Sequence, residues 1–279
     1  MKKPKIHPLK INFEIPVSQT LTLPRFVYLF AITGEKLHFI DTGVASAIIH
    51  IEEFLKTLNR KIFSIESIFL THSHPDHIGA AKLIQQKSNC SVYAPEKELE
   101  WITNTELQFQ QRPVPGFHKL VAGPVLVNYK LIDGQIVQPE ENITIKVIST
   151  PGHSAGSTSF YFKEQNVLFC GDAILLAGEL PIFENIIEYL NSLDKIKKIN
   201  PEILYSSWDE PRYKHEIPEI IEQSKLYILD IQKAAIKVSK DFKNHHTIEF
   251  CKAVLSALKQ NESLANPLLL KSFLACLKD

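Results

Sequence analysis

The sequence predicts an α/β fold for about residues 10–210, followed by a helical segment that begins near residue 218. Short β-rich runs alternate with amphipathic helical runs in the first region, which is typical of sheets with helices packed on them. No clear strand pattern occurs after residue 218. The hydrophobic content of 44% and the charged content of 22% are ordinary for a folded chain of 279 residues.

The first half of the α/β region begins with two β-rich runs. Residues 25–33 (RFVYLFAIT) and 36–43 (KLHFIDTG) are separated by Gly-Glu, which predicts a hairpin-like turn. Residues 45–61 place large apolar side chains at helical spacing, so we expect a helix there. A short apolar strand at 66–72 and a helix at 79–87 follow.

The second half of this region predicts three strands, a helix and a last strand. The three strands cover residues 143–150, 157–163 and 166–172. Residues 183–198 carry isoleucine and leucine on one stripe, as in a helix that packs on a sheet. Residues 202–208 (EILYSSW) have the pattern of a final strand.

The stretch from about 102 to 140 has weak periodicity and contains residues that interrupt regular structure. Long loops inside a compact domain are often functional. We therefore expect this stretch to form a lid or one wall of a pocket. The interrupting residues are Pro113, Pro115, Gly116, Gly123 and Pro124.

Three helices are predicted in the C-terminal segment, at about 218–240, 246–259 and 266–278. We expect the chain to divide into a larger unit over residues 1–215 and a helical extension over residues 216–279.

Charge and cysteine usage argue against several classes of protein. Lys and Arg together number 31, as do Asp and Glu, whereas a nucleic-acid-binding protein usually carries a basic face. The four cysteines lie far apart without CxxC spacing, which favours reduced thiols and a cytoplasmic location. No run approaches the roughly 18 apolar residues of a membrane span. We expect neither a nucleic acid nor a membrane as a partner.

Residues 72–77 (HSHPDH) concentrate metal-binding types of side chain directly after an apolar run. His72 and His74 alternate on extended backbone, so both can point the same way. Pro75 then bends the chain, which lets Asp76 and His77 approach from another direction. Imidazole nitrogens and carboxylate oxygens are the ligands that Zn²⁺ and related ions prefer at catalytic sites. The motif therefore predicts a metal site.

Four motifs, in order, make the chain resemble the metallo-β-lactamase superfamily of metallohydrolases over roughly residues 25–210. HFIDTG contains Asp41, HSHPDH follows the next strand, TPGHSAGS supplies His153, and LFCGDAI supplies Asp172. The resemblance implies a four-layer αββα sandwich with a C-terminal helical extension. It leaves open whether the chain is closer to glyoxalase II-like or lactonase-like members.

The resemblance also implies a cofactor and its ligands. The implied ion is Zn²⁺, one or two per chain, with iron and manganese as alternatives. Asp76 is expected to orient a metal-bound hydroxide and to accept a proton, and Asp41 to brace the ligand loops. The implied ligands are His72, His74 and His153 for one ion, Asp76 and His77 for the second, and Asp172 between the two.

A fifth motif departs from the family pattern. Members of the family usually carry a last metal-binding histidine just after a strand, but here LYSSWDEP places Trp208 at that position. The indole N–H is a donor only and cannot serve as an ordinary metal ligand. Either Asp209 or His215 replaces this histidine, or the second metal site is weak or vacant. We favour a shifted ligand over vacancy.

The resemblance implies a hydrolase whose metal-bound hydroxide attacks an ester, lactone or thioester bond of a small molecule. An apolar acyl portion would suit a pocket lined by aromatic side chains, for which Trp101, Phe109, Phe117 and Trp208 are candidates. The oligomeric state stays open, with a homodimer as one alternative.

Two other functions stay open at this point. The first is a mononuclear iron oxidoreductase similar to sulfur dioxygenases, in which His72, His153 and Asp172 hold the iron. The second is a binding protein without turnover. The intact HSHPDH motif argues against the second alternative.

Overall fold

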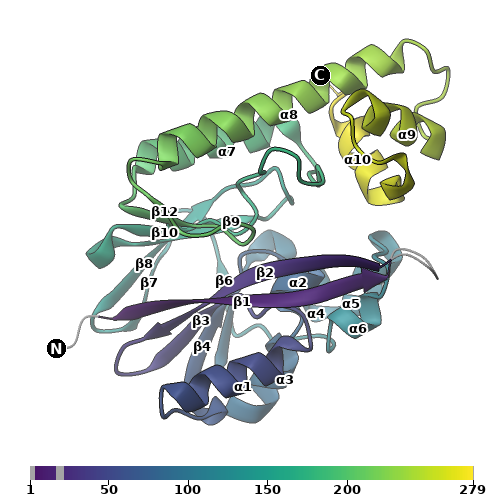
Figure 1. Cartoon of the computed structure of the whole chain (residues 1–279). Helices are drawn as coiled ribbons and strands as arrows, with labels where there is room; N and C mark the ends of the chain where they lie inside the picture. The colour runs from purple at the N-terminus through teal and green to yellow at the C-terminus, as the bar shows by residue number, and fades with distance from the viewer. Residues whose placement is uncertain (1–3, 17–21, 279) are drawn as a thin grey trace.

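Two six-stranded sheets form the centre of the fold (Figure 1). The structure is a computed structural model that describes residues 4–16 and 22–278. The outer limits of the two expected units, residues 1 and 279, lie outside these described residues. The first sheet is built, in spatial order, from β1 (Lys5–Pro16), β2 (Thr22–Thr33), β3 (Leu37–Ile40), β4 (Ile65–Phe69), β5 (Ser91–Pro95) and β6 (Tyr129–Leu131).

The second sheet follows the first in the chain. Its strands, from one edge to the other, are β12 (Arg212–Tyr213), β11 (Ile203–Tyr205), β10 (Val167–Phe169), β9 (Thr158–Phe162), β8 (Ile143–Ser149) and β7 (Ile136–Glu140). Neighbouring strands from β7 to β10 pair antiparallel. β10 and β11 pair parallel and are connected by the helix α7 (Ile186–Ile199).

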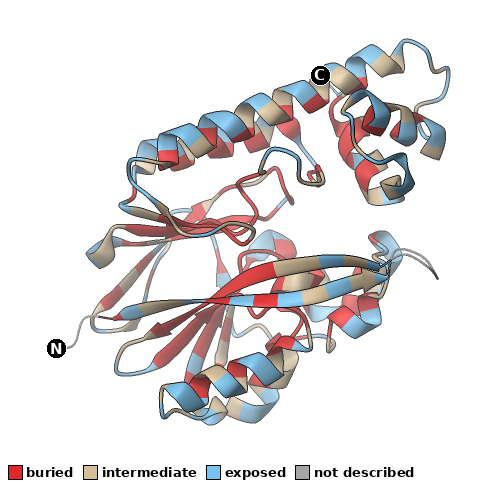
Figure 2. Ribbon diagram, in the orientation of Figure 1, coloured by how far each residue is buried: buried red, intermediate tan, exposed pale blue. Residues whose placement is uncertain are grey.

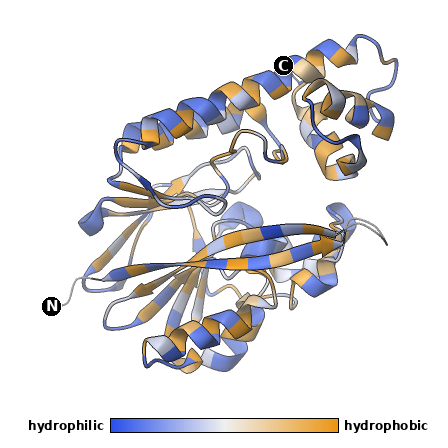
Figure 3. Cartoon of the chain, viewed as in Figure 1, coloured by the Kyte–Doolittle hydropathy of each residue, from blue (hydrophilic) through white to orange (hydrophobic). Residues whose placement is uncertain are grey.

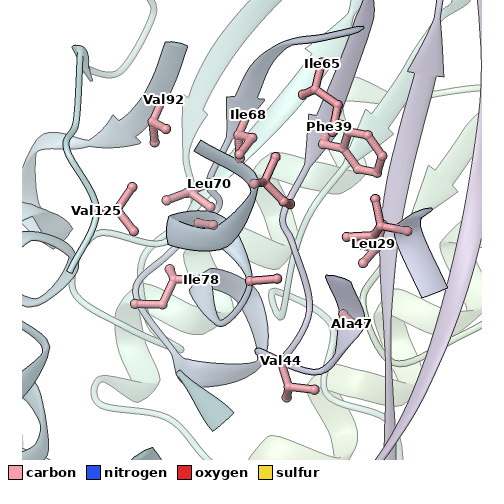
Figure 4. Packing of buried hydrophobic residues seen from close by; sticks show 14 of the residues in the cluster. Leu29, Phe39, Val44, Ala47, Ile65, Ile68, Leu70, Ile78, Val92 and Val125 are labelled. Carbon is pink, nitrogen blue, oxygen red and sulfur yellow. The ribbon is translucent and has the colours of Figure 1, made fainter. Parts of the chain in front are cut away.

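The outer face of the first sheet is covered by α1 (Ala47–Thr57) and α3 (Ala81–Ser88). These helices connect the parallel strands β3, β4 and β5, since a parallel pair requires a crossover connection. α1 buries Ala47, Ile51 and Leu55, which lie one helical turn apart. Figure 4 shows Ala47 in the same packed cluster as Leu29, Phe39 and Ile68 of the strands.

Aromatic side chains fill the space between the two sheets. The ring centroids of Phe30 and Phe169 lie 5.1 Å apart, and those of Phe69 and Phe160 lie 5.7 Å apart. Each pair joins a strand of one sheet to a strand of the other, so this layer holds the sheets face to face. Buried residues lie along the strands of both sheets in Figure 2.

Three helices complete the chain, as predicted: α8 (Ile217–Ser239), α9 (Ile248–Ala257) and α10 (Pro267–Ala275). Hydrophobic and hydrophilic residues alternate along α8 (Figure 3). Its buried residues share one apolar cluster with α7, α9 and α10. With α7 and α8 outside the second sheet, and α1 and α3 outside the first, the chain is a four-layer αββα sandwich.

Several elements were missing from the sequence-based prediction. β1 alternates buried and exposed positions in its middle and pairs with β2 along its whole length, from Lys5↔Thr33 to Pro16↔Thr22. The stretch 102–140 contains α5 (Thr105–Gln111), α6 (Phe117–Leu120), β6 and β7 rather than a continuous loop. β5 and β12 were also missed. These strands are short or half exposed, so their apolar pattern is weak.

No helix in the described part of the chain is long and apolar enough to cross a membrane.

Candidate metal centre

Loops that follow β4, β8 and β10 bring the predicted ligand residues together. The strands expected at 66–72 and 166–172 end at Phe69 and Phe169, so His72 and Asp172 lie on the loops beyond them. The short helix α2 (Pro75–Ile78) begins after His74 and carries Asp76 and His77. His153 lies in the turn between β8 and β9.

The first cluster of potential ligands is fully buried and consists of His72, His74, His153 and Asp172. His153 Nε2 lies 2.8 Å from His74 Nδ1 and 3.2 Å from Asp172 Oδ2. His72 Nε2 lies 3.9 Å from the same carboxylate oxygen. Three imidazole nitrogens and one carboxylate oxygen thus face a common point.

The second cluster consists of Asp76, His77 and Asp172. His77 Nε2 lies 3.1 Å from Asp172 Oδ1 and 3.7 Å from Asp76 Oδ2. Asp172 therefore turns one oxygen toward each cluster. This is the arrangement that a carboxylate bridging two cations requires.

Hydrogen bonds on the outer nitrogens set the tautomers of three histidines. His77 Nδ1 donates to Asp41 at 2.8 Å, and His153 Nδ1 donates to the Ile182 carbonyl oxygen at 2.8 Å. His72 Nδ1 donates at 3.0 Å to the Thr71 hydroxyl, which in turn donates to Asp41. In the neutral form of each ring the inner Nε2 then carries a lone pair.

Some of these inward-facing atoms have no hydrogen-bond partner among the described residues: His72 Nε2, His77 Nε2 and Asp172 Oδ1 are buried and unpaired. Unpaired buried acceptors are costly unless something satisfies them. Ligand rings whose second nitrogen is held by a carboxylate, hydroxyl or carbonyl are the usual surroundings of a bound metal ion. The side chains present therefore fit one or two divalent cations.

Burial dominates the pKa of three of the histidines, whereas neighbouring charge dominates the pKa of Asp172. Burial lowers the pKa of His72, His74 and His153, which keeps these rings in the neutral form that binds metals. Burial alone would raise the pKa of Asp172, but His77 and His153 hold that pKa well below its usual range.

Asp41 braces the loop that follows β4. Its carboxylate accepts hydrogen bonds from the Thr71 backbone N–H at 2.8 Å and from the Thr71 hydroxyl at 2.7 Å, in addition to the bond from His77. Asp41 has a positive φ of 57°, which is uncommon for a residue with a side chain. The structure therefore places Asp41 behind the ligands, in the position expected for it.

Glu98 is a buried residue of this centre that the sequence analysis missed. Its carboxylate accepts hydrogen bonds from the backbone N–H and the hydroxyl of Ser73, from the Ser154 hydroxyl at 2.7 Å, and from the Gly156 N–H at 2.7 Å. It thus joins the loop of His72–His77 to the loop of His153. Nothing in the local sequence APEKELEW distinguishes this glutamate from its neighbours.

The structure does not support the expectation that Asp209 or His215 replaces the missing histidine. The Asp209 carboxylate accepts hydrogen bonds from Arg212 Nε at 2.6 Å and Nη2 at 3.0 Å, and His215 is exposed. Neither residue belongs to the clusters found among the described residues. The second cluster therefore has three protein side chains, and Trp208 lies at a cavity wall instead.

A cavity of about 880 Å³ opens at the two clusters, within the range of about 300–1,000 Å³ typical of ligand pockets. Phe109 and Trp208 line it, as expected, whereas Trp101 and Phe117 are not among its lining residues. Residues from the stretch 102–140 form one wall, which confirms the expected pocket wall. Other apolar walls come from the β1–β2 hairpin, the loop after β10 and the segment 263–268 before and at the start of α10.

The profile of the Metallo-beta-lactamase superfamily matches residues 22–208. The chain belongs to this superfamily.

Two curated relatives within the metallo-beta-lactamase superfamily illustrate the similarity. The chain is 28% identical over 220 residues to a beta-lactamase-like protein 2 homolog of Caenorhabditis elegans. It is 30% identical over 179 residues to a hydroxyacylglutathione hydrolase of Bartonella henselae. These alignments cover 77% and 61% of this chain but only 65% and 60% of the relatives, so the chain spans less than two thirds of their length.

Solved structures of the metallo-beta-lactamase superfamily share the fold. A family member from Thermus thermophilus has a TM-score of 0.75 at 21% identity, over 96% of this chain and 92% of that chain. A subclass B3 metallo-beta-lactamase of Bradyrhizobium japonicum has a TM-score of 0.60 at 19% identity, over 77% and 89%. The likeness confirms the predicted four-layer sandwich.

Proposed function

We propose that this member of the metallo-beta-lactamase superfamily is a metal-dependent hydrolase that cleaves an ester, lactone or thioester bond of a small molecule with an apolar acyl portion. The observation that carries the proposal is Asp172, which turns one carboxylate oxygen toward each of two ligand clusters at the base of a largely apolar cavity. The name of the Bartonella henselae relative, a hydroxyacylglutathione hydrolase, supports hydrolysis of an acyl compound. The balanced charge of the chain, with a pI of about 7.2, favours a small molecule over a nucleic acid.

The residues that would hold the cofactor are the six of the two clusters, and Zn²⁺ is the ion that suits them best because four of them are imidazoles. When bound, such an ion acts as a Lewis acid that activates water and polarises the scissile carbonyl. The imidazoles of His72, His74 and His153 supply neutral donors, and Asp172 supplies negative charge to both positions.

Asp76 is the residue that we assign to proton transfer. It lines the cavity and has a side chain 17% exposed, whereas the side chain of His77 beside it is fully buried. A carboxylate at the open edge of the cluster can orient an attacking water and accept its proton. The apolar walls of the cavity exclude bulk water from the reacting carbonyl, which strengthens electrostatic interactions inside.

The experiment combines metal analysis with a substrate panel. Purified full-length protein is assayed for bound metals and for turnover of esters, lactones and thioesters with Zn²⁺, Mn²⁺ or Fe²⁺. We expect hydrolysis that His74→Ala abolishes. His50→Ala is the matched control, because His50 is an exposed histidine on α1 that contacts Glu53.

Two results would overturn the proposal. One iron per chain, with oxygen uptake and no hydrolysis, would establish the oxidoreductase alternative, which the second cluster favours because it has only three protein side chains. Absence of turnover across the whole panel, with metal bound, would favour a binding protein instead.

A further inference from the structure

Arg112 is a cationic residue at the wall of the cavity that the proposed hydrolysis does not use. It ends α5, where its backbone N–H donates to the Gln108 carbonyl oxygen at 2.7 Å. Pro113 follows and restricts the backbone of Arg112 to extended conformations, so the residue has little freedom. Arg112 is only 7% exposed, and it lines the same cavity as His74 and Asp76.

The Arg112 guanidinium has no partner in the part of the chain that the structure describes. Among those residues it donates no hydrogen bond and forms no ion pair. The carboxylates that act on it at longer range are Asp76, Glu184, Glu98 and Asp172. Glu98 and Glu184 already accept hydrogen bonds from Gly156 and Ala155.

A guanidinium carries five N–H donors in a planar fork that matches a carboxylate or a phosphate. Burying such a charge without a hydrogen-bonded partner is unfavourable. Arg112 lines the cavity together with the ligand residues His74 and Asp76, so we expect a ligand in the cavity to satisfy its unused donors.

Arg25 provides a contrast on the same cavity. Its guanidinium donates to Glu179 at 2.7 Å and lies over the Trp208 indole, with Cζ 4.2 Å from the ring centroid. Its charge is therefore already paired and packed. Of the two arginines that line the described cavity, Arg112 is the one without an ion-pair partner among the described residues.

We propose that Arg112 binds an oxyanion group of the substrate, a carboxylate or a phosphate, while the apolar body of the substrate lies against the walls formed by residues such as Val114, Leu176 and Leu268. This inference rests on the proposed function, since it describes the substrate of the same cavity. The substrate class is an anionic amphiphile. Its oxyanion group contacts Arg112, and its scissile bond faces the metal ligands.

The experiment measures binding, so that it does not depend on turnover. Decanoate, decyl phosphate and decan-1-ol are titrated by calorimetry into the full-length, metal-loaded protein. We expect at least one of the two anions to bind about 10- to 100-fold more tightly than the alcohol, the range of a charge-assisted hydrogen bond. The more tightly bound anion identifies which oxyanion the site accepts.

Variants attribute this preference to Arg112. Arg112→Gln should reduce the anion-to-alcohol ratio to about one, and Arg112→Lys should retain part of it. The matched control Arg60→Gln, at an arginine that does not line the cavity, should keep the wild-type ratio. An Arg112→Gln variant that keeps the full preference would overturn the inference, because the anion would then be bound by the metal.

Equal affinity of the wild-type protein for all three probes would also overturn it, without reference to any variant. An Arg112-dependent preference in a protein that hydrolyses no ester, lactone or thioester would leave the anion site established and the hydrolase proposal rejected.

Discussion

The backbone N–H of Gly156 donates a hydrogen bond of 2.7 Å to the carboxylate of Glu98, 58 residues earlier in the chain. Because Glu98 also accepts from both donors of Ser73, this one buried carboxylate connects the two loops that carry the histidine ligands. The geometry of the metal centre therefore depends on a residue that contributes nothing to either ligand cluster.

Replacing Glu98 should weaken both folding and metal binding. Glu98→Ala leaves the N–H groups of Ser73 and Gly156 buried without an acceptor, and we expect the free energy of unfolding to fall by about 2–4 kcal/mol. Chemical denaturation of the chelator-treated protein measures this change. Glu96→Ala in the same segment is the control and should have little effect, since Glu96 is exposed. Unchanged stability in Glu98→Ala would contradict the bracing role.

Replacing Asp172 should remove more bound metal from the protein than replacing His77. Asp172→Ala removes a ligand from both clusters, whereas His77→Ala removes one from the second cluster alone. We expect Asp172→Ala to lose nearly all bound metal and activity, and His77→Ala to retain one ion per chain. Elemental analysis after dialysis measures the stoichiometry. Full loss of metal in His77→Ala would mean that the first cluster does not hold an ion independently.

Asp41 should influence metal affinity through His77 without touching the ion. Asp41→Ala removes the acceptor that orients the His77 ring, and we expect metal affinity to fall by about 10- to 100-fold. Asp41→Asn keeps one oxygen to accept from His77 and should lose less. Competition with a chromophoric chelator gives both affinities, and equal loss in the two variants would argue against this orienting role.

Trp208→His should strengthen binding of the second ion. The resemblance of LYSSWDEP to the fifth family motif implies that Trp208 stands in place of the last metal-binding histidine, and Trp208 lines the cavity that Asp76 also lines. An imidazole there would add a fourth side chain to Asp76, His77 and Asp172. The metal-to-protein ratio at limiting Zn²⁺ tests this expectation. An unchanged ratio would show that the side chain at position 208 does not reach the second cluster.

The metal-free protein should lose stability in mild acid. Burial lowers the pKa of His72, His74 and His153 below the ordinary value of 6.5, so these groups bind more protons when unfolded and their effect grows as the pH falls below that value. His77 has the opposite sign: burial would lower its pKa but Asp172 raises it, so its contribution is present below pH 6.5 and is lost as the pH rises through its folded pKa.

The three histidines with a lowered pKa outweigh His77. We therefore expect the free energy of unfolding to decrease by about 1–3 kcal/mol when the pH falls from about 7.5 to about 5.5. Urea denaturation of chelator-treated protein at the two pH values measures the change. A stability that rises toward acid would show that the charge on His77 dominates the cluster.

Local sequence patterns were sufficient for much of the fold and for the ligand clusters. The motif HSHPDH carries four of the clustered residues within six positions, and the predicted helices agree with α1, α3, α7 and the three C-terminal helices. These features depend on periodicity or on neighbouring positions, which a chain displays whatever its tertiary structure. β5, β6 and β12 escaped prediction because they are short and partly exposed, whereas the equally short β3 and β10 are buried throughout and show an apolar run.

The sequence by itself determined the alternation of strands and helices, the family motifs and the residue types that can hold a metal ion. Only the tertiary structure decided that Glu98 joins two ligand loops and that the Arg112 guanidinium is buried at the cavity without a described partner. The physical reason is that burial and pairing are properties of long-range contacts. Hydrogen bonds and charge interactions act over a few ångströms in space, and the residues that share them here lie tens of positions apart in the chain.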